Sequence, residues 1–216
     1  MKSVALVFIV GFISGYMIAG IESAHVSVTA PPGIGSEQNA VHSNDGLQTP
    51  SEKPVIQSLI DEKIGLQFLY RTYPDSYVLS QFIKTPHDDV TFVKGYRLML
   101  LTDKEELDHS TAPREGPPTI SVLVFKNDEK LAPKVWALQF PTISNISLTH
   151  AAPLNTTLSR ADAIRYTVDG LYKGDTVIAT SGRYIYVFSG MYTDEQSPIR
   201  ADFISFLSSV EFLPIQ

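Results

Sequence analysis

Residues 181–192 read SGRYIYVFSGMY, a turn-forming Ser-Gly followed by an aromatic side chain at every second position: Tyr184, Tyr186 and Phe188. Two residues is the side-chain period of a β-strand, so the three rings belong to one face of a strand. The preceding residues, TVIAT at 176–180, favour a strand as well. This stretch therefore predicts a β-hairpin with its loop at Ser181 and Gly182.

A loop at these two positions pairs Ala179 with Tyr184 and Val177 with Tyr186. The hairpin then has an aliphatic face and an aromatic face. A folded domain rarely leaves apolar faces of this size open to water, so we predict that both are covered and that the rings belong to the core. The aliphatic face holds Ile178, Ile185 and Val187, and the aromatic face holds Val177, Ala179, Tyr184, Tyr186 and Phe188.

Tyrosine keeps an alternative open, because its hydroxyl favours the border of a core, where it meets water or a polar partner. Under this alternative Tyr184, Tyr186 and Tyr192 form a candidate binding surface.

Four other segments show strand patterns, and the last is apolar at nearly every position from Ile120 to Phe125, which indicates a central strand covered on both faces. The acidic, proline-containing residues 103–118 are predicted to be a loop. The four strand segments are IGLQFLYRTYP at 64–74, DSYVLSQFI at 75–83, TFVKGYRLMLLT at 91–102 and TISVLVFKND at 119–128.

Two segments predict helices. Residues 134–140, KVWALQF, fit one short helix. Near the C-terminus, Ser197 is a suitable N-cap and Pro198 a suitable first helical residue. The apolar residues that follow recur at helical spacing and predict one face packed on a sheet, before a brief extension, EFLP, at 211–214. That face consists of Ile199, Phe203, Phe206, Leu207 and Val210.

The N-terminal residues 3–21 contain no charged side chain. As a helix this run is about 28 Å long, enough to cross the hydrocarbon core of a bilayer. Lys2 precedes it and Glu22 follows, so we expect a signal anchor over residues 1–22, with a cytoplasmic N-terminus and all later residues outside. A cleaved secretory signal is the alternative, with its cleavage site among the small residues 19–24. Gly11 and Gly15 have the spacing that lets two membrane helices dimerise weakly.

Residues 23–53 are rich in Pro, Gly, Ser, Asn and Gln, which predicts a disordered linker with a reach of about 30 Å. Residues 54–216 remain as one extracytoplasmic globular domain.

Three segments carry a family resemblance: GLQFLYRTYPDSY at 65–77, the late hairpins at 164–192, and FISFLSSVEF at 203–212. Together they resemble the PsbP-like domain superfamily over residues 54–213. The resemblance implies an α+β fold, an antiparallel sheet flanked by helices in an α/β/α sandwich. It also implies adaptor, assembly or binding roles, with no catalytic residue to carry over. A membrane anchor would set this chain apart from the soluble members.

Composition excludes several classes of function. The chain has no cysteine, which excludes disulfides, thiolate metal sites and a cysteine nucleophile. A net charge of -6 without a basic cluster argues against nucleic acid. No phosphate-binding loop or serine-nucleophile motif is present, and we predict neither a cofactor nor a metal site.

Two hypotheses remain. The preferred one is a non-enzymatic, membrane-tethered extracytoplasmic domain that binds a protein or a cell-envelope component. The alternative is an envelope-acting hydrolase that uses loop carboxylates, in segments where His87 and His109 also lie. Its candidate residues are Asp88, Asp89, Asp103 and Glu106.

Overall fold

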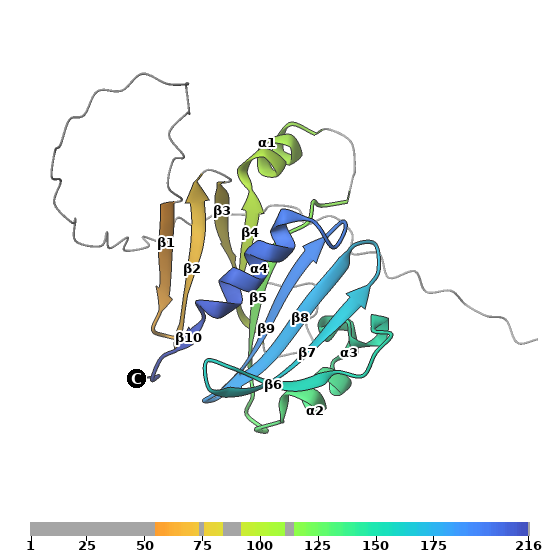
Figure 1. The fold of residues 1–216 in the computed structure, drawn as a ribbon. Helices are drawn as coiled ribbons and strands as arrows, with labels where there is room; N and C mark the ends of the chain where they lie inside the picture. The colour runs from red at the N-terminus through yellow and green to blue at the C-terminus, as the bar shows by residue number, and fades with distance from the viewer. Residues whose placement is uncertain (1–54, 74–75, 84–91, 111–114, 216) are drawn as a thin grey trace, which may run out of the picture.

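The computed structural model describes residues 55–73, 76–83, 92–110 and 115–215, and the strands among them form two antiparallel sheets (Figure 1). The smaller sheet has three strands in the order β1 (Val55–Asp61), β2 (Leu66–Tyr73) and β10 (Glu211–Phe212). The larger has seven strands, in the order β3 (Tyr77–Phe82), β4 (Phe92–Leu100), β5 (Ile120–Lys126), β9 (Tyr184–Tyr192), β8 (Lys173–Ser181), β7 (Ala161–Asp169) and β6 (Leu154–Leu158).

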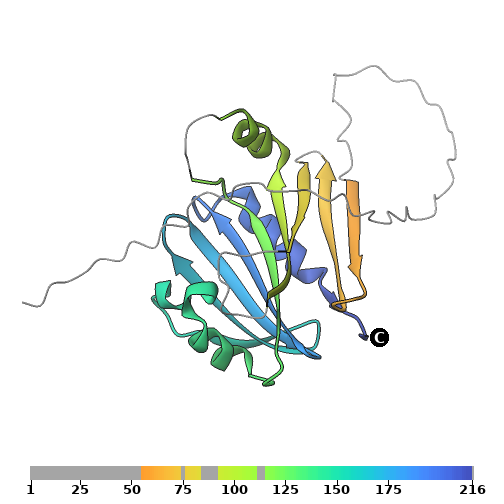
Figure 2. The ribbon, with the colours of Figure 1, turned by 180° about the vertical axis from the view of Figure 1, so that it is seen from behind.

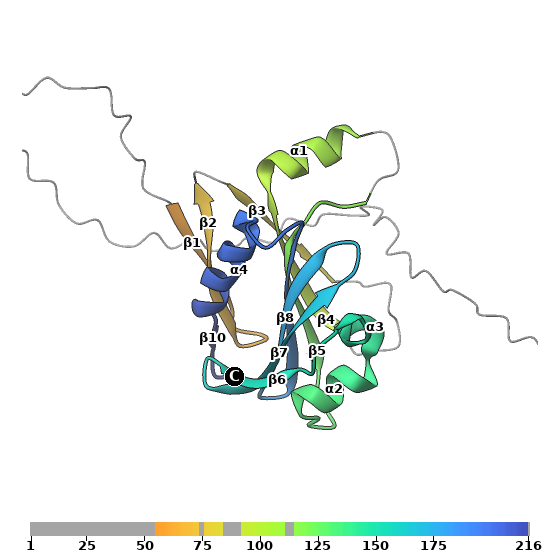
Figure 3. The same ribbon diagram turned by 45° about the vertical axis from the view of Figure 1, so that its right-hand side comes forward.

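Helices cover both faces of the seven-stranded sheet, which confirms the predicted α+β arrangement. The helix α4 (Pro198–Ser208) lies on one face, and α2 (Pro133–Gln139) and α3 (Pro141–Ser144) lie on the other (Figures 2 and 3). The three-stranded sheet shares the face of α4, and its existence as a separate sheet was not predicted. The remaining elements are α1 (Leu101–His109), at the end of β4, and the short 3-10 helix η1 (Ile146–Leu148).

The β8–β9 hairpin exists, but its loop consists of Gly182 and Arg183, because Ser181 pairs with Tyr184. Gly182 has a φ of +57°, a conformation that glycine reaches without the clash of a Cβ atom. A two-residue hairpin loop of type II′ needs glycine at its first position, whereas the predicted loop placed glycine second. The predicted loop position was therefore wrong by one residue.

The predicted strand pairs were wrong for the same reason: Ala179 pairs with Tyr186, and Val177 pairs with Phe188. Each β8 residue thus meets a partner two positions further along β9 than predicted. A displacement of two leaves every side chain on its original face, because side-chain direction alternates with a period of two. The two predicted faces are therefore confirmed, and both are buried.

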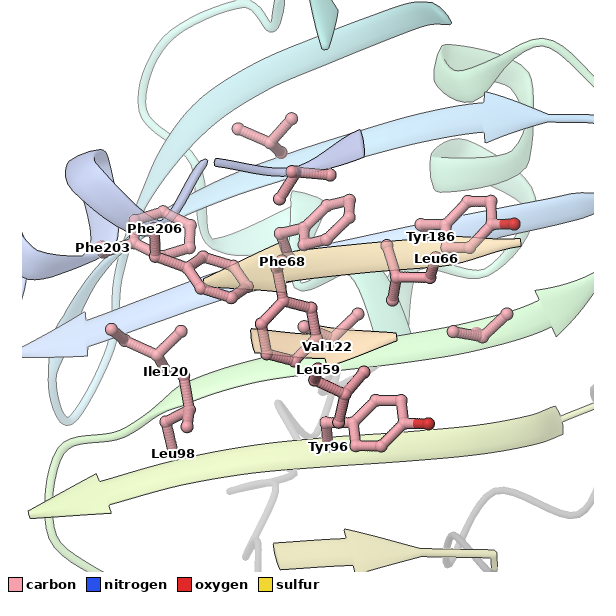
Figure 4. Close-up of a cluster of buried hydrophobic side chains, with 14 of the residues drawn as sticks. Leu59, Leu66, Phe68, Tyr96, Leu98, Ile120, Val122, Tyr186, Phe203 and Phe206 are labelled. Carbon is pink, nitrogen blue, oxygen red and sulfur yellow. The ribbon is translucent and has the colours of Figure 1, made fainter. Parts of the chain in front are cut away.

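The aromatic face of the hairpin packs under α4 and the three-stranded sheet. In this cluster the inner side chains of β1 and β2, Leu59, Leu66 and Phe68, meet side chains of β4, β5 and β9 (Figure 4). The aliphatic face packs on the opposite side, against Trp136 and Ala137 of α2. The seven-stranded sheet thus separates two hydrophobic clusters.

The segments predicted as strands contain β2, β3, β4 and β5, and the predicted short helix at 134–140 corresponds to α2. The predicted loop at 103–118 was wrong in its first part, because residues 101–109 form α1. Glu and Lys favour helices, and Lys104 forms an ion pair with Asp108 one turn later. The described prolines of this segment, Pro117 and Pro118, come after the helix.

The predicted C-terminal helix is confirmed as α4. Pro198 is its first residue and Ser197 occupies the N-cap position, although its side chain makes no cap hydrogen bond in the described structure. Ile199, Phe203 and Phe206 are buried, as the apolar spacing predicted.

The predicted membrane anchor at residues 1–22, with Gly11 and Gly15, and the predicted linker at 23–53 lie outside the described residues. Within the ranges that the structure describes, no helix is long and apolar enough to cross a membrane.

Candidate binding surface

The three tyrosines of the candidate aromatic surface are buried. Tyr184 is 4% exposed, and Tyr186 and Tyr192 are fully covered. The Tyr186 hydroxyl donates a hydrogen bond to the carbonyl oxygen of Ile64, in the turn between β1 and β2. The three-stranded sheet and α4 therefore occupy the surface that a ligand would need, and these rings are core residues.

Tyr192 lies beside a charged group at the N-terminal end of α4. The Arg200 guanidinium is 5.1 Å from the Tyr192 ring centroid and donates from Nε to Asp175 at 2.9 Å. Burial, together with the charge of Asp175, raises the pKa of Tyr192 to about 12. Tyr192 therefore stays a neutral phenol at physiological pH.

The carboxylates of the hydrolase hypothesis fall in two groups. Asp103 and Glu106 lie on α1, a helix that buries none of its side chains. Asp88 and Asp89 lie outside the described residues, as does His87. No group of three or more His, Asp or Glu side chains in the described ranges is arranged to hold a metal ion.

A surface that the sequence did not single out is the outer face of the three-stranded sheet. Its aliphatic side chains Ile56, Ile60 and Leu69 are 49%, 54% and 42% exposed. Leu69 is paired with Ser58, which stands between the two isoleucines on β1. Strand geometry places Leu69 within about 7 to 8 Å of both isoleucines, measured diagonally between α-carbons. We call these three residues, together with Ser58, the β1–β2 outer face.

Large exposed hydrophobic side chains are concentrated there. The described residues include twelve such side chains. Four of them, Val55 and the three aliphatic residues of the β1–β2 outer face, lie on two adjacent strands. On α2, Val135 and Leu138 form a smaller pair. A single exposed aliphatic residue is ordinary, whereas a group on one rigid face indicates an interaction site.

Polar contacts at both ends hold the small sheet to the rest of the domain. At one end, Asp61 of β1 accepts hydrogen bonds from Lys94 and Tyr96 of β4 through one carboxylate oxygen. At the other end, Asp202 of α4 accepts from Arg71 at 2.7 Å and from Tyr77 at 2.9 Å. The outer face is therefore carried by a sheet that is held to the rest of the domain.

Asp61 is ionised in this arrangement. Burial alone would raise its pKa, but the hydrogen bonds from Lys94 and Tyr96 and the charge of Lys94 outweigh burial, so the pKa is lowered below its ordinary value. Burial and the neighbouring carboxylate raise the pKa of Tyr96, which therefore remains a hydrogen-bond donor.

The strand β1 is also an edge strand. It pairs with β2 on one side, and no described strand pairs with its other side. At the middle of this edge, the Ser58 hydroxyl oxygen is buried and has no hydrogen-bond partner among the described residues.

A sequence signal for this surface existed in VIQSLID at 55–61, where apolar residues occur on both faces of the strand. The sequence could not show which face points inward, because Leu59 and Ile60 are neighbours of similar hydrophobicity. Packing decides it: Leu59 is 3% exposed and Ile60 is 54% exposed.

No protein-family model matches this chain, and no curated protein matches it. Among solved structures, it is similar to the cyanobacterial PsbP (CyanoP) of Synechocystis, with a TM-score of 0.48 and 13% identity over 77% of this chain and 98% of that one.

Two further solved structures are similar over a comparable part of this chain. A Bacteroides thetaiotaomicron protein has a TM-score of 0.42 and 10% identity, over 73% of this chain and 48% of its own. LpqN of Mycobacterium tuberculosis, which is involved in cell envelope biogenesis, has a TM-score of 0.32 and 16% identity, over 74% of this chain and 92% of its own. The solved structures similar to this chain thus include a cyanobacterial PsbP.

Proposed function

We propose that this protein is a non-enzymatic, membrane-tethered extracytoplasmic domain that binds a protein or cell-envelope component through the β1–β2 outer face. The observation that carries the proposal is the exposure of Ile56, Ile60 and Leu69 on a sheet whose other face packs into the core. Water contact with these side chains is unfavourable, so covering them stabilises a complex.

The position of this face in the chain supports a tethered role. The strand β1 is the first described element, and it follows directly on the predicted linker and membrane anchor. With a linker reach of about 30 Å, the face can meet partners at or near a membrane surface.

The hydrolase alternative is less well supported by the geometry. General acid–base catalysis usually relies on carboxylates whose pKa is shifted by burial or by close partners in a cleft. Asp103 and Glu106 lie on α1, which buries no side chain. The described part of that candidate set thus lies outside the buried core.

Fractionation tests the tether. The full-length protein should pellet with membranes and resist carbonate extraction, and external protease should digest the chain beyond about Glu22. Recovery of a soluble mature form that starts near residue 25 would instead identify the N-terminal segment as a cleaved signal.

Site-specific photo-crosslinking tests the surface. A photoreactive phenylalanine analogue replaces Ile60 or, as the matched control, Leu138 on α2, which is 59% exposed on the opposite side of the large sheet. We expect discrete crosslinked products in native membranes from position 60 and none from position 138. Equal labelling at both positions would contradict a binding role for the β1–β2 outer face.

A further inference from the structure

We propose that the partner at this surface is a second copy of the chain, whose β1 pairs antiparallel with β1 across a two-fold axis at Ser58. The two three-stranded sheets then join into one continuous sheet. This inference rests on the proposed function, since it names the partner of the same surface.

The edge of β1 is suited to pairing. Natural edge strands are commonly protected by charges, prolines or bulges, because their free N–H and C=O groups can bind another strand. In this protein such features lie at the two ends of β1. One end has a register shift between Val55 and Ile56, and the other end has the charged Asp61. Residues 56–60, IQSLI, contain no charge, proline or glycine. Among the described residues, nothing at the centre of this edge hinders strand addition.

The spacing of the aliphatic residues makes this edge complementary to itself. Ile56 and Ile60 stand symmetrically on either side of Ser58. An antiparallel pair centred on Ser58 sets Ile56 opposite Ile60 of the partner subunit, on the same outer face, because residues that pair directly share a face. The exposed aliphatic groups of the two copies then form one continuous apolar stripe.

The same register gives a partner to a buried polar atom. The Ser58 hydroxyl oxygen has none among the described residues, and an unsatisfied buried hydroxyl is unfavourable. Across the two-fold axis Ser58 lies opposite Ser58 of the partner subunit, and rotation about χ1 turns the two covered hydroxyls toward each other, so that they can donate and accept between them.

The chain outside the described residues is long enough for this pairing. In the proposed register the two Val55 residues lie six positions apart along the strands, about 20 Å. If residues 23–53 form the predicted linker, two such linkers, each with a reach of about 30 Å, allow both copies to start from one membrane site. Tethering to one membrane raises the effective concentration of one copy for the other.

Disulfide mapping tests the register, because the natural chain contains no cysteine. The full-length Ser58→Cys variant is reconstituted in phosphatidylcholine vesicles and oxidised with copper phenanthroline. Directly opposed residues on antiparallel strands have α-carbons about 4.5 to 5.5 Å apart, within the range of a disulfide. We expect the apparent mass on a non-reducing gel to double from 23.8 kDa.

The matched controls are Ile56→Cys and Ile60→Cys, which lie on the same strand and are more exposed. In the proposed register, each of these residues lies four positions along the strand from the same residue of the partner subunit. This separation is about 13 Å, which is too far for a disulfide. Each alone should stay monomeric on the gel, whereas a mixture of the two variants should crosslink. Adding Ile60→Lys to Ser58→Cys should abolish the Ser58 crosslink, because it sets a charge on the apolar stripe.

Crosslinking by all three single-cysteine variants would indicate random collision and overturn the inference. The inference would also be overturned if neither the Ser58→Cys variant nor the mixture of Ile56→Cys and Ile60→Cys forms a crosslinked dimer. The mixture tests the same register with other cysteines, so poor reactivity of a cysteine at position 58 alone does not decide the result. If photo-crosslinking at position 60 still yields products of another mass, the proposed binding function stands and only self-pairing fails. If neither experiment yields products, both proposals fail.

Discussion

Phe188 is fully buried at the centre of the aromatic face, where its ring packs on Tyr186, Phe206 and Phe212 with centroid distances of 6.2 to 6.5 Å. These neighbours come from three different elements, β9, α4 and β10. Because all three would have to move to fill the space left by the ring, the substitution leaves a cavity. We expect Phe188→Ala to lower the free energy of unfolding by about 3 to 5 kcal/mol, as measured by chemical denaturation.

Two tyrosine variants provide the comparison. The Tyr184 hydroxyl lies 3.4 Å from the carbonyl oxygen of Lys63, a long contact, so Tyr184→Phe should change stability little. The Tyr186 hydroxyl is the buried donor to Ile64, so Tyr186→Phe should cost about 1 to 3 kcal/mol by leaving that carbonyl unsatisfied. A near-neutral Phe188→Ala would show that the ring does not support the core.

Asp61 makes stability depend on pH in the acid range. Its pKa is lowered in the folded state, so its contribution is fully present above the unfolded value of about 3.9 and is lost as pH falls through the folded value. Asp61→Asn should therefore flatten the acid decline of the unfolding free energy below about pH 4, as measured by urea denaturation at a series of pH values.

The control for this prediction is Asp162→Asn, which removes an exposed carboxylate on β7. It should leave the acid decline as steep as in the unmodified protein. If Asp61→Asn also leaves the slope unchanged, the contacts of Asp61 with Lys94 and Tyr96 contribute nothing to the coupling between stability and pH.

At the scale of elements, α4 approaches β9 closely because Gly190 has no side chain. A Cβ atom at this position would lie 2.4 Å from Cγ of Phe203, well inside van der Waals contact. Gly190→Ala should therefore displace α4 and cost about 1 to 3 kcal/mol in thermal or chemical unfolding. Gly116→Ala, with no heavy atom within 4 Å of the added Cβ, should stay within about 0.5 kcal/mol of the unmodified protein.

The elements also show which local signals were reliable. The apolar spacing of α4 and the alternation of β9 predicted their buried faces, because burial is what selects those patterns. The hairpin loop was misplaced by one residue, because the choice between Ser181-Gly182 and Gly182-Arg183 depends on backbone geometry rather than on hydrophobicity. The helix α1 was missed because it buries no side chain and so has no apolar period to detect.

At the scale of the whole molecule, every described element and both hydrophobic clusters lie within residues 55–215. We therefore expect a fragment of residues 54–216 to fold by itself, with a cooperative thermal transition and a dispersed nuclear magnetic resonance spectrum. The full-length protein in detergent should show the same transition. A fragment that is unfolded without residues 23–53 would show that the predicted linker belongs to the folded domain.

The sequence by itself determined the two faces of the β8–β9 hairpin and the packing face of α4, because these follow from local periodicity, and the α+β class was what the family resemblance implied. Only the tertiary structure decided that residues 55–61 join residues 66–73 and 211–212 in a separate sheet, since such pairing connects segments far apart in the chain. It also decided that Tyr184, Tyr186 and Tyr192 are core residues and that Ile56, Ile60 and Leu69 face outward. The physical reason is that hydrophobicity alone does not distinguish a buried strand face from an exposed one; the elements packed against each face do.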